Sequence, residues 1–307
     1  MSGVLKGLFK YGFFDGPQDL ISKGYSGEDK MSPKQFIVMG TVFVLIILLS
    51  VLLRKAGKER LFNIYRVLAV FMPFLEIAKI AFSTYHGLRQ GEHFDLGGML
   101  PLYTCSMLLY FLPFVAWGKG WIRKASMAFF SSIGMVAGLT NFVYLSAAGW
   151  YPILTFGGLY SVFFHAVIVF VGMSLFITGE YTPSLKTIAE GMIPVLLFSA
   201  FVIPLNFIIV SNPEYGYVDY MLLMNANGFV PVISDFFIDH HIRLLFSFLM
   251  LFVAYPLANA ITVMIEIGAA RIVRRSGGKQ EPAKEKTVRD WDEPTEQTGT
   301  QRRRTAD

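Results

Sequence analysis

The sequence predicts an all-α integral membrane protein, a polytopic bundle of about seven transmembrane helices. Apolar residue types make up 54% of the 307 residues and charged types only 16%, whereas soluble domains carry about 25% charged residues. The 15% of aromatic residues also excludes a disordered chain. Several long segments contain no charged residue, and each is at least as long as the ~20 residues that cross a bilayer core. These segments are 96–118, 126–179, 191–213 and 244–265.

Helix start signals and apolar runs locate the individual spans. Ser32, Pro33 and Gln35 have the spacing of an N-cap, a first-turn proline and a capping box before the first apolar run. Thr182 and Pro183 repeat the cap-then-proline pattern before the sixth. The predicted spans are 35–53, 61–82, 99–117, 125–145, 154–177, 186–210 and 242–267.

The distribution of Lys and Arg predicts an N-terminus outside and a C-terminus in the cytoplasm, because cytoplasmic links carry an excess of these residues. Basic residues gather in alternate links. Arg54, Lys55, Lys58 and Arg60 follow the first span, and Lys119, Arg123 and Lys124 follow the third. Ten further Lys and Arg residues follow the seventh span. Two segments fit poorly, since the link after the fifth span has only Lys186 and the outer arm has five Lys. We therefore expect a multi-pass protein of the cell membrane.

Three parts of the chain are expected to differ in structure. An N-terminal arm at 1–34 has an amphipathic start, with Leu5, Leu8 and Phe9 beside Lys6 and Lys10, that suits a membrane surface. The seven-helix membrane domain covers 35–267. Residues 268–307 form a polar tail that we expect to be disordered and cytoplasmic. Its basic residues suit anionic lipid better than nucleic acid, so membrane lipids are the expected partners.

Polar side chains inside the predicted spans gather at one depth. Such groups are costly in hydrocarbon and mark functional sites or helix contacts. At a rise of ~1.5 Å per residue, the polar side chains of five consecutive spans fall in the outer half of the bilayer. They are Glu76 and Lys79, Cys105, Asn141, His165 and Asn206. We expect a polar pocket that opens toward the outer leaflet.

Each of these residues also has a purely structural interpretation. Glu76 and Lys79 are three positions apart and can neutralise each other. Gly134, Gly138 and Asn141 share one helix face, a pattern typical of close helix packing with an interhelical hydrogen bond. A lone cysteine in a membrane span is usually a small apolar filler. A lone histidine there is harder to explain, because an unpaired imidazole is costly to bury.

No cofactor or metal is expected. The predicted outer links contain seven His and Asp residues, but their spacing matches no metalloenzyme pattern and is typical of solvated loops. These residues are His86, His93, Asp95, Asp235, Asp239, His240 and His241. The single cysteine excludes an intramolecular disulfide or a multi-Cys zinc site. Phosphate-binding loops, dinucleotide fingerprints and nucleophile-elbow motifs are also absent from the sequence.

Several motifs resemble one family of membrane proteins. Leu-Pro-Leu-x-x-Cys ends at Cys105, the Gly157-Gly158 pair leads to His165, and an outer Tyr-Met-Leu segment begins at Tyr220. Together with Glu76 and Lys79, these residues make the chain similar to the bacterial YwaF-like proteins and the eukaryotic transmembrane protein 164 group. The eukaryotic group transfers fatty acyl chains among phospholipids with a Cys and a His that match Cys105 and His165. The resemblance thus implies a membrane-embedded lipid acyltransferase or acyl hydrolase.

Such chemistry needs a nucleophile, a base and donors for an oxyanion. Cys105 is the candidate nucleophile and His165 the candidate base. Asn141 and Tyr103 are candidate oxyanion donors, and Glu76 is a candidate for orienting His165 unless Lys79 holds it. Two non-enzymatic alternatives stay open at this point: a membrane transporter or receptor for an apolar ligand, and a structural bundle whose polar groups hold helices together.

Overall fold

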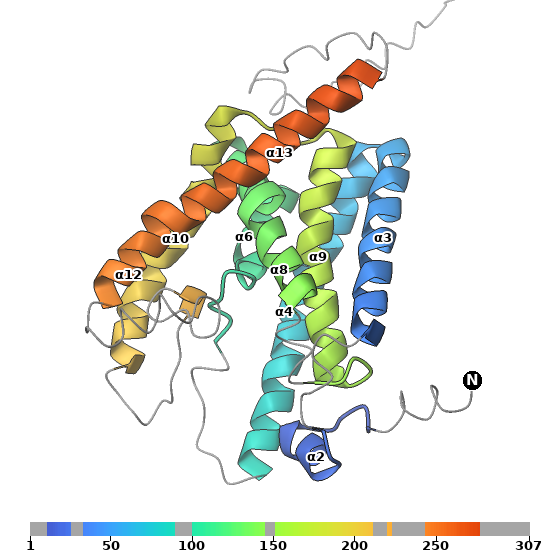
Figure 1. Cartoon of the computed structure of the whole chain (residues 1–307), viewed down its shortest axis with the longest axis vertical. Coiled ribbons are helices and arrows are strands. Elements are labelled where there is room, and N and C mark those ends of the chain that lie inside the picture. The colour runs from blue at the N-terminus through green and yellow to red at the C-terminus, as the bar shows by residue number, and fades with distance from the viewer. Residues whose placement is uncertain are drawn as a thin grey trace, which may run out of the picture.

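The computed structural model describes residues 11–25, 33–89, 100–144, 151–210, 220–222 and 243–276. Within these ranges every regular element is a helix, which confirms the all-α prediction (Figure 1). The predicted amphipathic start at residues 5–10 and the predicted disordered tail from residue 277 onward lie outside the described residues.

Six helical stretches of the described chain are long and apolar enough to cross a membrane, and a seventh apolar helix is shorter. Together they match the seven predicted spans. The first three in chain order are α3 (Pro33–Ala56), α4 (Lys58–Arg89) and the short α6 (Met107–Trp117). The fourth is a continuous rod formed by α7 (Gly120–Phe129), η1 (Phe130–Gly134) and α8 (Met135–Tyr144). The last three are α9 (Phe156–Thr178), α10 (Leu185–Val210) and a second rod formed by α12 (Arg243–Leu249), η4 (Met250–Ala254) and α13 (Tyr255–Ser276).

Three helix ends differ from the predicted ones by seven residues or more. The helix predicted to begin at 99 begins at Met107, and residues 100–106, which include Cys105, form bends and turns before it. The α4 helix continues past the predicted end at 82 to Arg89, and α13 continues past 267 to Ser276. Apolar runs mark the part of a helix in hydrocarbon, so they miss helical turns that continue into the polar interface.

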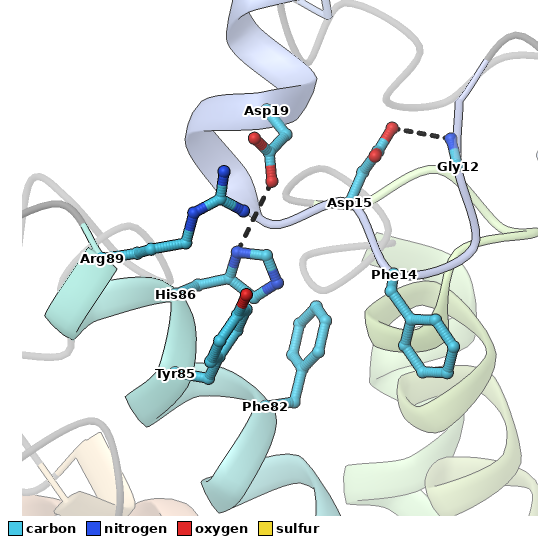
Figure 2. Close-up of a pocket in the computed structure, with 8 residues that line it drawn as sticks. All are labelled: Gly12, Phe14, Asp15, Asp19, Phe82, Tyr85, His86 and Arg89. Carbon is cyan, nitrogen blue, oxygen red and sulfur yellow. Dashed lines mark hydrogen bonds and ion pairs between the residues drawn. The ribbon is translucent and has the colours of Figure 1, made fainter.

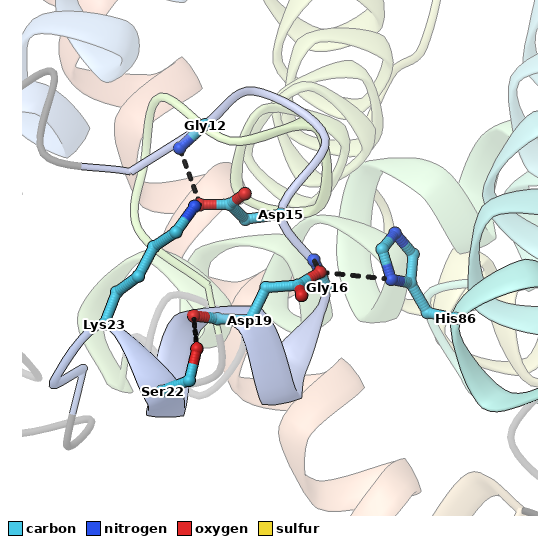
Figure 3. Close-up of polar contacts among 7 residues, drawn as sticks. All are labelled: Gly12, Asp15, Gly16, Asp19, Ser22, Lys23 and His86. Carbon is cyan, nitrogen blue, oxygen red and sulfur yellow. Dashed lines mark hydrogen bonds and ion pairs between the residues drawn. The ribbon is translucent and has the colours of Figure 1, made fainter. Parts of the chain in front are cut away.

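The extension of α4 corrects the expectation for His86. This residue lies within α4 and is 5% exposed, so it does not belong to a solvated loop. The short helix α2 (Pro17–Ser22) covers it, with Gly16 directly against the imidazole ring. Asp19 accepts a hydrogen bond from the Gly16 amide at 3.1 Å and lies 3.5 Å from His86 Nδ1 (Figure 3).

Phe13 and Asp15 hold the segment before α2 in place. The Phe156 amide, at the start of α9, donates to the Phe13 carbonyl at 2.7 Å. Burial alone would raise the pKa of the Asp15 carboxyl, but the side chain of Lys23, the Gly12 amide and the His86 ring together lower this pKa below its ordinary value. A cavity of about 510 Å³ remains between this segment and the end of α4, lined in part by aromatic rings (Figure 2).

The centre of the bundle is formed by α9 and the α7–η1–α8 rod. In each, 67% of the most apolar window is buried, against 22% in α3 and 17% in α4. The α4 and α9 helices run antiparallel, and the Tyr65 hydroxyl bonds to the Ser174 hydroxyl at 2.7 Å between them. Farther along the same interface, the Phe71 and Phe163 rings meet at 6.0 Å. This register determines which side chains of α4 and α9 share one level.

Glycine allows backbone contact between the central helices. A Cβ atom at Gly172 of α9 would overlap the Phe130 carbonyl oxygen of η1, and one at Gly138 of α8 would lie 2.7 Å from Val169 Cγ2. The packing predicted from the glycine stripe is therefore present at Gly138. Gly134 instead lies closest to residues of its own rod. Small residues at membrane helix crossings permit this close approach.

Replacing Gly172 with Ala should destabilise the protein, because the added methyl group must displace the backbone of η1. Overpacking of this kind costs about 1–3 kcal/mol. Thermal unfolding of the purified protein in detergent should show a clearly lower Tm. Gly40→Ala is the matched control, since no heavy atom lies within 4 Å of the added methyl group. Equal Tm values for the two variants would show that the crossing at Gly172 is not tightly packed.

Candidate active site

Cys105 lies in the turn that precedes α6. Its carbonyl accepts the Leu108 amide at 3.1 Å, and Ser106 is the N-cap residue of the helix. The thiol is free, not part of a disulfide, and it is partly accessible. It interacts with the Ser106 hydroxyl and with the backbone N–H groups of Cys105 and Ser106. The sulfur therefore faces the electropositive start of a helix, where backbone amides favour negative charge.

A chain of hydrogen bonds fixes the residue before the cysteine. The Tyr255 hydroxyl, at the start of α13, donates to the Met221 carbonyl at 3.0 Å. It has only one proton, so the Thr104 hydroxyl must be the donor in its 2.5 Å contact with Tyr255. Thr104 is thus linked through Tyr255 to the short helix η3 (Tyr220–Leu222).

The η3 segment is itself held by α10. Asn206 accepts the Tyr220 amide at 3.0 Å and donates to the Tyr220 carbonyl at 3.0 Å, so one buried side chain satisfies both backbone groups. Tyr220 and Met221 are fully buried, and Met221 has a φ of 57°, a left-handed conformation that is rare for a residue other than glycine. Asn206, predicted to belong to the polar layer, thus positions this turn.

A second polar cluster surrounds Glu76 on α4. Lys79 Nζ lies 3.2 Å from one carboxylate oxygen, and the Tyr160 hydroxyl of α9 donates to the other. The charge of Glu76 also acts on Cys105, and Tyr160 interacts electrostatically with Cys105. The predicted mutual neutralisation of Glu76 and Lys79 is therefore present. Both lie in the same neighbourhood as the thiol.

His165 is buried in α9, five positions after Tyr160, which is about 7.5 Å along the helix axis. Its Nδ1 lies 2.8 Å from the Ser161 carbonyl. A carbonyl only accepts, so Nδ1 must carry the proton and the neutral ring presents Nε2 as its acceptor. The Ser161 backbone thus orients the imidazole, and Glu76, held by Lys79 and Tyr160, makes no contact with it.

The two candidate oxyanion donors lie on different elements, and Asn141 is on the helix that packs against α9 beside His165. It follows Gly138 by three positions in α8, and Gly138 packs beside the His165 carbonyl. Because α8 and α9 run antiparallel, Asn141 lies nearer the Ser161 end of α9 than His165 does. Tyr103 belongs to the Thr104 turn, 37% exposed, with its ring 5.6 Å from that of Tyr220.

The structure thus brings Glu76, Tyr160 and Cys105 into one electrostatic neighbourhood. Within the described chain, Cys105 and His165 form no direct hydrogen bond with each other. Tyr160, Tyr255 and Ser161 were not expected from the sequence, although a tyrosine hydroxyl inside a membrane span requires a partner and could have drawn attention to the first two. No group of three or more metal-binding side chains forms within the described residues. Of the seven His and Asp residues of the predicted outer links, His86 is described and the other six lie outside the described residues.

Comparison with known proteins identifies the family. A sequence model of the TMEM164 family matches residues 30–258, which cover nearly all of the described membrane bundle. Searches of curated proteins and of solved structures found no significant match.

Removing the Tyr255 hydroxyl should loosen the turn that carries Cys105, because Thr104 and the Met221 carbonyl both lose their partner. Each lost hydrogen bond is worth about 1 kcal/mol. Two lost bonds correspond to about 30-fold, so we expect Tyr255→Phe to increase the labelling rate of Cys105 by a small maleimide by up to about 30-fold. Cys105 is the only cysteine, so the label reports on this position alone.

The matched control for this experiment is Tyr85→Phe, which removes a hydroxyl from a side chain that is 59% exposed. Its labelling rate should equal that of the unmodified protein. An unchanged rate in Tyr255→Phe would mean that the hydroxyl does not restrain the turn.

Proposed function

Because the chain belongs to the TMEM164 family, we propose that this multi-pass membrane protein is a lipid acyltransferase or acyl hydrolase with Cys105 as nucleophile and His165 as base. The observation that carries the proposal is the hydrogen bond from His165 Nδ1 to the Ser161 carbonyl. It leaves Nε2 of the neutral ring as a proton acceptor, which is the form that a general base requires.

The surroundings of Cys105 act in both directions on its role as nucleophile. A thiolate is the reactive form of cysteine. Burial of the thiol disfavours that form, so a base must take the proton, whereas nearby hydrogen-bond donors and a helix N-terminus favour it. Cys105 has the Ser106 hydroxyl, two backbone N–H groups and the start of α6 beside it. The negative charge of Glu76 opposes a thiolate, and Lys79 and Tyr160 reduce this effect by binding both carboxylate oxygens.

The proposed reaction has two stages. His165 Nε2 takes the thiol proton, and the Cys105 sulfur attacks the ester carbonyl of a phospholipid. The new C–S bond forms, the C–O bond breaks, and the imidazolium returns its proton to the departing lysolipid oxygen. In the second stage His165 deprotonates an acceptor hydroxyl, from a lysolipid or water, which attacks the thioester and regenerates the thiol.

Two structural requirements follow from this scheme. Cys105 and His165 must approach within hydrogen-bond reach when substrate is bound, and catalytic hydrogen bonds are often long or absent in substrate-free enzymes. The oxyanion must also meet donors, for which we propose the Asn141 amide and the Tyr103 hydroxyl. The turn that contains Tyr103 and Cys105 is restrained by the contact between Thr104 and Tyr255, so any movement of the turn must break or shift that contact.

The location of the site agrees with a substrate that arrives from the bilayer. Glu76, Tyr160 and Cys105 lie toward the end of the bundle opposite the basic link at Lys58. Under the positive-inside rule this end is the outer one. We therefore propose the cell membrane as the location, membrane phospholipids as the substrates, and an entry from the outer leaflet.

Replacing either proposed catalytic residue should abolish acyl exchange while the protein stays folded. In liposomes that contain a labelled phospholipid and an unlabelled lysolipid, Cys105→Ser and His165→Ala should each reduce transfer by at least about 100-fold. Ser161→Ala is the control, because the group that orients His165 is a backbone carbonyl and is retained. Transfer is measured by mass spectrometry of the lipids.

A thiol-reactive lipid probe tests the pair in a second way. It should label the unmodified protein at Cys105 and label His165→Ala far more slowly. Full acyl exchange by Cys105→Ser would refute the mechanism. Absence of exchange in the unmodified protein across phospholipid classes would favour the transporter or receptor alternative.

A further inference from the structure

A second cavity lies at the opposite end of α4 from Glu76. Its volume is about 420 Å³, and it is formed by the first turns of α4, the end of α6 and the beginning of α7. Its lining combines basic and aromatic side chains: Lys58, Glu59, Phe62, Arg66, Ala116, Trp117, Gly118, Lys119 and Arg123. Four cations and one carboxylate give this lining a formal charge of +4 − 1 = +3.

The contacts of the lining side chains show how this charge is arranged. Lys58 pairs with Glu180 at 3.2 Å. Arg66 donates to the neutral Asn63 side chain at 2.6 Å. The Arg123 guanidinium lies 4.3 Å from the centre of the Phe62 ring, a contact that attracts a cation without neutralising it. Even with Glu180 included, the pocket has an excess of two positive charges.

The pocket also brings like charges together. Arg66 and Arg123 come from different helices, and Glu180 attracts Arg123 more strongly than Arg66 repels it. An anion bound between the cations would add a second attractive partner. Guanidinium groups bind phosphate oxygens with good geometry, and ammonium groups add charge. The chemistry of the lining therefore favours a phosphate group.

The surroundings favour a phosphate that is attached to a lipid. Trp117 is 51% exposed at the mouth of the pocket, and tryptophan is enriched at the level of lipid headgroups. Beyond Arg66, α4 exposes Val67, Val70 and Phe71 on its outer surface. In a bilayer this apolar surface is covered by acyl chains, so a lipid can place its chains on α4 and its headgroup at the pocket.

Membrane topology alone does not require this pocket. The positive-inside rule depends on how many Lys and Arg residues a link carries, and their side chains need not converge. Arg54 and Lys55 meet that rule without lining the cavity, whereas Arg66 and Lys119 line it from α4 and from the α6–α7 connection. Substituting the Arg54–Lys55 pair or the Arg66–Lys119 pair therefore distinguishes an effect on membrane topology from an effect on binding in the pocket.

We propose that this basic pocket binds the phosphate group of an anionic membrane lipid, as a site separate from Cys105. Basic pockets between transmembrane helices on the cytoplasmic side are suited to anionic headgroups. The proposal depends on the convergence of the four cations and not on acyl-transfer activity, so it stands or fails independently of the function proposed above.

Native mass spectrometry of the full-length protein released from detergent tests the site. Phosphatidylglycerol should bind more tightly than phosphatidylcholine. The double variant Arg66→Gln/Lys119→Gln should weaken phosphatidylglycerol binding roughly 30-fold, because each cation contributes about 1 kcal/mol near a membrane surface. Phosphatidylcholine binding should change little. Size-exclusion chromatography checks that the variant is folded.

Two matched variants make the result interpretable. Arg54→Gln/Lys55→Gln removes the same charge from the same end of the bundle, outside the pocket, and should keep the preference for phosphatidylglycerol. Arg66→Lys/Lys119→Arg retains the charge and should also keep most of the preference for phosphatidylglycerol. Equal effects of the two Gln pairs would overturn the proposal, since general electrostatic attraction would then explain binding.

Inorganic phosphate and glycerol phosphate form a separate arm of the experiment. Competition by millimolar phosphate in the unmodified protein, lost in Arg66→Gln/Lys119→Gln, would support the phosphate site but assign it to a soluble anion. Preference for phosphatidylglycerol without such competition supports the lipid headgroup. Equal binding of phosphatidylglycerol and phosphatidylcholine, with no phosphate binding, would refute the site.

Discussion

The backbone contact between α9 and the α7–η1–α8 rod is the constraint on which the rest of the structure depends. Membrane helices gain little from apolar burial against each other, so association relies on close packing and interhelical hydrogen bonds. Gly172 and Gly138 remove the side chains that would separate these two central elements. The α4 helix then packs antiparallel on α9, with Tyr65 bonded to Ser174. This register is what places Glu76 opposite Tyr160.

Polar groups at the two ends of the bundle are satisfied in different ways. Near Cys105, three polar side chains form hydrogen bonds with another element: Glu76 with Tyr160, Thr104 with Tyr255, and Asn206 with the Tyr220 backbone. Such networks rigidify a buried region because an unpaired member is costly there. At the start of α4, by contrast, four cations and one carboxylate line a single pocket. The first arrangement holds a fixed geometry, and the second concentrates positive charge.

The sequence predicted the helices better than the contacts between them. Apolar runs located all seven spans, because hydrocarbon disfavours charge over a fixed thickness. They did not predict the turns at 100–106, since these residues continue the charge-free segment that leads into α6. Residue type and depth identified Cys105, His165 and Asn206 as members of a polar layer. They could not identify Tyr160 as the partner of Glu76 or the Ser161 carbonyl as the partner of His165, because both depend on helix register and rotation.

The irregular backbone around Cys105 is the strongest structural reason to regard this end of the bundle as a site. Non-helical backbone at membrane depth is tolerated only where protein buries it or where it lines a cavity. Here two such segments meet, the turn before α6 and the η3 turn, and Met221 adopts a left-handed conformation while fully buried. Strained conformations persist only where surrounding contacts determine them. The proposed role of Cys105 as a nucleophile at a helix start is compatible with an irregular turn beside it.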